Sequence, residues 1–253
     1  MRLLRALWLL LFLPFALAAS EPKLVPDVSQ REIQIRYSFT GAQLLLFGAV
    51  LYPGGRVPTD RVDIAVVVKG PMQPILVREK QKVAGIWMNV ESERFRSAPS
   101  FYAVASSRPL PELVDERTAA IYELGVQNLQ LSPGAGASPE ERQRFEAGLI
   151  DLQQRHQLYF ETPRGVEITG GVLYRARIDI PARVPVGNYT AETFLIRNGE
   201  VVAAAVREIR IEKLGFERFV ATAAQQWSLA YGLVAVAVSL LLGWGASAAF
   251  RRG

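Results

Sequence analysis

Hydrophobic and polar residues alternate over several short stretches of the chain, and a period of two is typical of half-buried β-strands. In the first half the predicted strands cover residues 33–39, 62–68, 74–83 and 85–90, together with a more uniformly apolar strand at 42–52. A second series covers residues 166–169, 172–180, 186–197 and 201–211. Asn198-Gly199 separates the last two stretches, and this pair between alternating runs is a strong signal for a two-residue hairpin turn.

The middle of the chain has a helical period instead. Apolar residues spaced for a helix predict one that begins near Pro111 and ends at Gly125. The sequence from Ser138 to Glu141 forms a capping box and predicts the start of a second helix. Its apolar stripe consists of Phe145, Leu149, Leu152 and His156. Strands on both sides of two helices predict a mainly β fold, an immunoglobulin-like antiparallel β-sandwich with a helical insert at about residues 108–158.

The N-terminal end resembles a targeting segment. Arg2 and Arg5 precede a short apolar run, and small residues suited to cleavage follow between positions 16 and 20. This pattern predicts a signal peptide over residues 1–20, with an uncleaved anchor helix as the alternative. The following residues, 21–212, are then the exported β-sandwich domain.

The C-terminal end predicts a membrane span. Residues 227–250 form an uncharged segment that is long enough to cross a bilayer. Trp227 and Tyr231 lie at its upstream edge, where aromatic rings prefer the headgroup level. Residues 213–226 form an expected juxtamembrane helix, and residues 251–253 a cytoplasmic tail with Arg251 and Arg252. The expected topology is a single pass, with the bulk of the chain outside the cytoplasm and the C-terminus inside it.

Composition narrows the chemistry. The chain has no Cys and one His, so thiol chemistry, disulfides and a His-rich metal site within one chain are excluded. Four of the 29 basic residues lie in the two end segments, which leaves the exported domain close to neutral against 24 acidic residues. The high pI therefore does not indicate nucleic-acid binding. His156 is expected at the margin of the core, and we predict no catalytic residue, metal or cofactor.

Two groups of residues are candidates for interaction. Arg78, Lys80 and Lys82 alternate on a predicted strand and would form a row on one face. Such a row either protects an edge strand, which the pattern favours, or binds an anion. Trp87 follows on the next strand, where a core position is favoured and an exposed position would indicate an interface. The second group is the face of small residues on the span, Ala235, Ser239, Gly243 and Ser247, whose spacing would allow close approach of another helix.

Several short segments, in this order, resemble the alphaproteobacterial putative transmembrane protein family, whose members have a signal peptide, an exported domain and one C-terminal helix. The segments are Phe39-Thr40-Gly41, Leu46-Phe47-Gly48-Ala49, Val68-Lys69-Gly70-Pro71, Gly85-Ile86-Trp87-Met88-Asn89, Ser100-Phe101-Tyr102-Ala103 and the span from Tyr231-Gly232 to Trp244. The resemblance covers nearly the whole mature chain. It implies a location and a class of organism more than a mechanism: the bacterial inner membrane, with the bulk of the chain in the periplasm. It also suggests a permease as partner.

The expected function is that of a non-enzymatic interaction or accessory protein. Its partners would be the lipid bilayer and another membrane protein, such as a transporter, or a second copy bound through the span. One alternative is a module that binds a small anion at the Arg78, Lys80 and Lys82 row. A third is an enzyme whose motif is not recognisable in the sequence.

Overall fold

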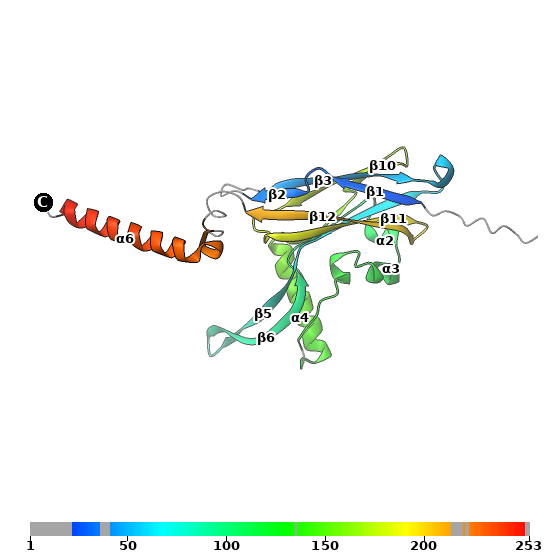
Figure 1. Cartoon of the computed structure of the whole chain (residues 1–253). Helices are drawn as coiled ribbons and strands as arrows, with labels where there is room; N and C mark the ends of the chain where they lie inside the picture. The colour runs from blue at the N-terminus through cyan, green and yellow to red at the C-terminus, as the bar shows by residue number, and fades with distance from the viewer. Residues whose placement is uncertain (1–21, 36–40, 135, 214–219, 221–222, 251–253) are drawn as a thin grey trace, which may run out of the picture.

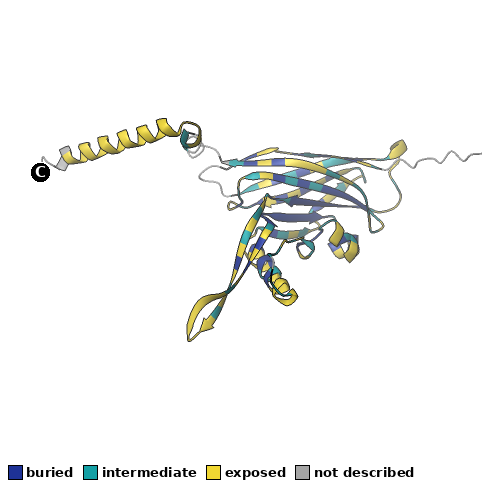
Figure 2. Ribbon diagram, turned by 60° about the horizontal axis from the view of Figure 1, so that its bottom comes forward, coloured by how far each residue is buried: buried dark blue, intermediate teal, exposed yellow. Residues whose placement is uncertain are grey.

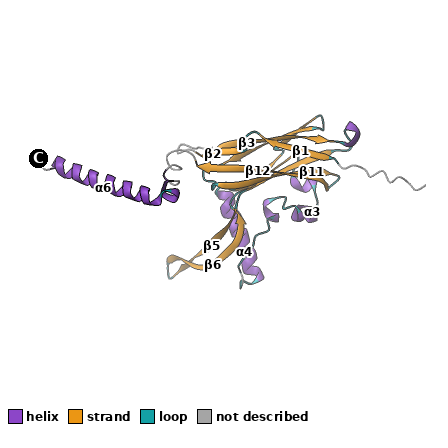
Figure 3. Ribbon diagram, in the orientation of Figure 1, coloured by secondary structure: helices purple, strands orange, loops and turns teal. Residues whose placement is uncertain are grey.

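The computed structural model describes residues 22–35, 41–134, 136–213, 220 and 223–250. The predicted signal peptide, residues 36–39 of the first predicted strand, Thr40 of the turn after it and the C-terminal arginines lie outside these residues. Most of the predicted juxtamembrane helix, at 214–219 and 221–222, also lies outside them. The fold is mainly β, as predicted, with helices in the middle of the chain and one long helix near its end (Figures 1 and 3).

Two sheets pack face to face. The four-stranded sheet has the order β1-β3-β10-β9 and is antiparallel throughout. Its strands are β1 (Lys23–Val28), β3 (Ala42–Leu51), β9 (Val166–Thr169) and β10 (Leu173–Ile180). The sequence did not predict β1, because Pro26 argues against a strand. Since β1 is an edge strand, it tolerates a residue that cannot donate a backbone hydrogen bond.

The six-stranded sheet has the order β2-β12-β11-β4-β7-β8. Its strands are β2 (Glu32–Ile35), β4 (Val62–Lys69), β7 (Tyr102–Ser106), β8 (Tyr159–Pro163), β11 (Gly187–Arg197) and β12 (Glu200–Lys213). β2 pairs with β12 and β7 with β8 in parallel, so the sheet is mixed, whereas an antiparallel one was predicted. The helical insert explains the second pair, because parallel neighbours need a long crossover connection.

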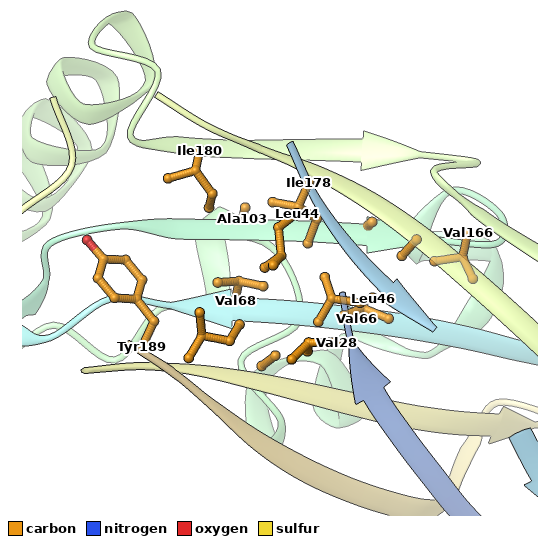
Figure 4. Close-up of a cluster of buried hydrophobic side chains, with 14 of the residues drawn as sticks. Val28, Leu44, Leu46, Val66, Val68, Ala103, Val166, Ile178, Ile180 and Tyr189 are labelled. Carbon is orange, nitrogen blue, oxygen red and sulfur yellow. The ribbon is translucent and has the colours of Figure 1, made fainter. Parts of the chain in front are cut away.

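The main core lies between the sheets. Residues on alternate positions of β4, such as Val66 and Val68, meet Leu44 and Leu46 from β3 and Ile178 from β10 (Figure 4). The intervening residues of β4 are also buried, because they face the helical layer on the other side of the sheet. β4 is therefore covered on both faces.

The helical insert forms that second layer. It contains α2 (Leu110–Leu113), α3 (Glu116–Ile121), a 3₁₀ turn at Val126–Asn128 and α4 (Pro139–Arg155). A separate 3₁₀ turn at Pro53–Gly55 lies between β3 and β4. The helix predicted from Pro111 to Gly125 is wrong as one element, because it breaks at Val114. Asp115 caps α3 there by accepting a hydrogen bond of 2.7 Å from the Thr118 amide. The capping box predicted at Ser138 and Glu141 is confirmed.

A two-stranded hairpin, β5 (Met72–Val83) and β6 (Ile86–Pro99), projects from the sandwich next to α4 (Figure 1). The chain ends in α6 (Ser228–Phe250), of which Ser228–Ser247 is apolar enough to cross a membrane. This helix agrees with the predicted span.

Candidate functional site

The β5–β6 hairpin is held at its base and free at its tip. Near the base, Val77 and Phe95 pack against Phe145 and Leu149 of α4. At the tip, Ala84 and Gly85 both have positive φ values, 49° and 88°, which is the geometry of a two-residue turn that follows the twist of the strands. The distal part of the hairpin is exposed on both faces (Figure 2).

The structure brings the candidate residues of this region together. Arg78, Lys80 and Lys82 are exposed at alternate positions of β5. Lys82 lies directly opposite Trp87 on β6. Residues opposite each other in an antiparallel pair share a face, so the cationic row and the indole ring form one surface.

Trp87 is not in the core, and this sequence prediction is wrong. Its side chain is 67% exposed, because no further layer covers the distal hairpin within the described residues. Other large apolar residues near the turn are exposed too: Val83, Ile86, Met88 and Val90. We call these four residues and Trp87 the apolar tip. In the sequence, the apolar tip could be recognised from apolar residues on both faces of two strands that are joined by a two-residue turn.

The acidic residues of the hairpin are directed elsewhere. Glu79 and Glu91 lie opposite each other, and both form ion pairs with Arg144 of α4. The Glu93 carboxylate accepts a hydrogen bond of 2.7 Å from the Gly134 amide. Arg144 thus holds both carboxylates on the α4 side, and Arg78, Lys80 and Lys82 give the opposite face its cationic character.

The small-residue face of the span lies on α6. Ala235, Ser239, Gly243 and Ser247 are all exposed there. The Ser239 hydroxyl donates a hydrogen bond of 2.8 Å to the Ala235 carbonyl of the same helix. This bond satisfies the hydroxyl within the helix, as an apolar environment requires. The face can therefore meet lipid or another helix without leaving that hydroxyl unpaired.

His156 lies at the C-cap of α4 and is exposed, which contradicts the expected place at the core margin. The buried face of α4 turns along the helix toward Ile150 and Gln153, and this leaves Leu152 and His156 uncovered. A cavity of about 670 Å³ lies beside this end of α4. It is lined by Gln154, Gln157 and the segments around Gly41 and Pro181. In the part of the chain that is described, no group of His, Asp and Glu side chains is arranged to hold a metal ion.

A partly buried ion pair lies near the start of β4, where buried Asp63 meets the half-buried side chain of Arg108. Arg108 donates to Asp63 through Nε at 3.1 Å, and the Ser107 hydroxyl donates to the same carboxylate at 2.7 Å. Burial raises the pKa of Asp63, but these donors outweigh it, so the pKa lies below the ordinary value. The pair borders a cavity of about 400 Å³. Its role is structural, because Arg108 also pairs with Glu112 and so holds the start of α2 against the sheet.

Lys69, at the other end of β4, contacts two carboxylates. Its Nζ lies 2.8 Å from Glu123 and 3.2 Å from Glu192. Burial lowers the pKa of Lys69, but the two glutamates outweigh it and the pKa is raised. Both partly buried ion pairs thus join the helical layer to the six-stranded sheet, and their polar atoms are engaged in structural contacts.

Comparison with known proteins concerns the family of the chain. No curated protein matches the chain. A family model described as "Putative transmembrane protein (Alph_Pro_TM)" matches residues 23–252, which covers the sandwich, the hairpin and α6. The chain therefore belongs to this transmembrane protein family.

Proposed function

We propose that the chain is a non-enzymatic interaction protein that is anchored in the inner membrane by α6 and displays its sandwich on the periplasmic side. Its protein partner is another membrane protein, such as a transporter, or a second copy of the chain. The observation that carries this proposal is α6, an apolar segment over Ser228–Ser247 with mean hydropathy 1.9 and no burial against the sandwich. Its small-residue face is open to a neighbouring helix.

We also propose an immunoglobulin-like architecture for the sandwich. The order β1-β3-β10-β9 corresponds to strands A, B, E and D of that fold, and β12-β11-β4 corresponds to G, F and C. Tyr189, at the start of β11, donates a hydrogen bond of 2.6 Å to the Pro185 carbonyl. This contact has the form of the tyrosine corner found at the start of strand F.

The exposure of Trp87 favours an interaction protein over the anion-binding alternative. Large apolar side chains that gather on the surface mark contacts with other molecules. The cationic row lies on a projecting hairpin, whereas a site for a small anion is usually concave. The three cavities described for this chain have other linings.

The test is a crosslinking pull-down from native membranes with two matched variants. Ser239→Leu/Gly243→Leu fills the small-residue face and keeps the helix apolar. Ala237→Leu/Gly245→Leu introduces the same bulk about 140° away around the helix. Because close packing rather than hydrophobicity drives association in lipid, only the first variant is expected to lose its co-purifying protein, at unchanged membrane yield. Equal recovery of partner from both variants would show that α6 is only an anchor.

A further inference from the structure

We infer that the tip of the β5–β6 hairpin inserts into the headgroup region of the bilayer that α6 spans. The protein would then touch the membrane at two places, the anchor helix and the hairpin. This inference uses the anchoring by α6 but does not depend on the protein partner proposed above.

The composition of the apolar tip matches the membrane interface. Ile86 is 71% exposed and Trp87 67%, and Val83, Met88 and Val90 lie beside them. An indole ring prefers the headgroup level, where its apolar body and its N–H are both accommodated. Aliphatic side chains next to it gain by burial at the boundary with the acyl chains. In water these apolar side chains remain exposed at a cost in free energy, so contact with a lipid surface is favourable for the tip.

The cationic row provides the matching charge. Arg78, Lys80 and Lys82 follow the hairpin from its middle to its tip, and Lys82 lies opposite Trp87. Long basic side chains can place their methylene stems along apolar groups while the charged ends reach phosphate oxygens. Anionic headgroups attract such clusters within about one Debye length, ~8–10 Å at moderate salt.

The hairpin keeps this charge separate from its own carboxylates. Glu79 and Glu91 are held by Arg144 on the α4 side. Arg144 also lies over the Phe145 ring, with its guanidinium carbon 5.4 Å from the ring centre. The positive face and the apolar tip are therefore presented together, on a support that is packed against α4.

The position of the hairpin agrees with a membrane contact. The tip and the first turns of α6 lie at the same end of the sandwich (Figures 1 and 2). β12 ends at Lys213, and residues 214–227 alone separate it from α6. A bilayer that contains α6 therefore lies beyond the end of the sandwich at which β12 ends, and the hairpin projects toward this end.

The absence of cysteine allows a direct test with single labelled sites. Ile86→Cys in the full chain carries an environment-sensitive fluorophore at the tip. Glu200→Cys carries it at the other end of β12, about 40 Å from Lys213 by strand length. Both positions are exposed, so the labels leave the core intact. The two proteins are reconstituted in vesicles of phosphatidylethanolamine and phosphatidylglycerol that contain lipids with a nitroxide in the headgroup region.

We expect a blue shift and strong quenching of the label at position 86 and neither effect at position 200. Lys80→Gln/Lys82→Gln, added to the position-86 variant, should reduce the quenching in these anionic vesicles. Equal, weak quenching at positions 86 and 200 would overturn the inference. Because the vesicles contain no other protein, this result is independent of whether α6 has a protein partner.

A photo-crosslinker in place of Trp87 separates lipid from protein contact in native membranes. The inference predicts adducts with phospholipid. A discrete protein adduct, together with an unquenched label in the lipid vesicles, would instead identify the hairpin as a protein-docking surface and would overturn the lipid contact.

Discussion

Asp63 is a buried carboxylate near the start of β4, and its partners come from the segment that leads into α2. Arg108 and Ser107 donate to it, and the pKa of Asp63 is held below its ordinary value of 3.8. A carboxyl group with a lowered pKa in the folded state stabilises that state above the ordinary pKa. The contribution is lost as the pH falls through the folded-state value.

We therefore predict that Asp63→Asn lowers the free energy of unfolding by about 2 kcal/mol at pH 7, because charged hydrogen bonds of this kind are worth ~1.5–3 kcal/mol. The difference between the two proteins should shrink as the pH falls below 3.8. Urea denaturation of both proteins at neutral and acid pH measures it. A constant difference at every pH would show that the charge of Asp63 contributes nothing.

At the scale of elements, the turn between β11 and β12 has the geometry that the sequence predicted. Asn198 and Gly199 have φ values of 52° and 84°. No atom lies within 4 Å of a Cβ placed on Gly199, so a substitution there meets backbone strain and no steric contact. Gly199→Val should destabilise the protein by on the order of 1–2 kcal/mol. Thermal unfolding followed by circular dichroism is the measurement.

Gly148 provides a control with the opposite sign. It lies inside α4, and a Cβ there also meets nothing within 4 Å. Gly148→Ala should stabilise the protein by about 0.5–1 kcal/mol, because alanine loses less backbone freedom when the helix forms. Equal shifts for the two substitutions would contradict an effect of positive φ at Gly199.

Sequence patterns predicted the strands and helix starts better than they predicted which strand faces are covered by another layer of the fold. The period of two located β10, an apolar run between turn signals located β3, and the sequence from Ser138 to Glu141 located the start of α4. Strand alternation shows which residues share a face, but not whether a second layer covers that face. For this reason the sequence alone does not reveal that Val67 is buried under the helical layer, and the core position favoured for Trp87 is wrong.

At the scale of the whole molecule, the proposed topology predicts the side of the membrane on which the insert lies. A reporter placed between Gly136 and Ala137 joins a loop before α4, so the capping box stays intact. An enzyme that is active only in the periplasm should be active at this site. A reporter that is active only in the cytoplasm should be inactive there, and its activity would reverse the proposed orientation.

The double coverage of β4 has a consequence for the order in which the protein opens. Its amide hydrogens lie between β11 and β7 in the sheet, with the four-stranded sheet on one face and the helical layer on the other. Loss of either layer alone leaves the strand pairing in place. In deuterated water these amides should exchange only through global unfolding, while amides at the tip of the β5–β6 hairpin exchange through local opening. The slowest-exchanging strand thus measures the stability of the entire sandwich.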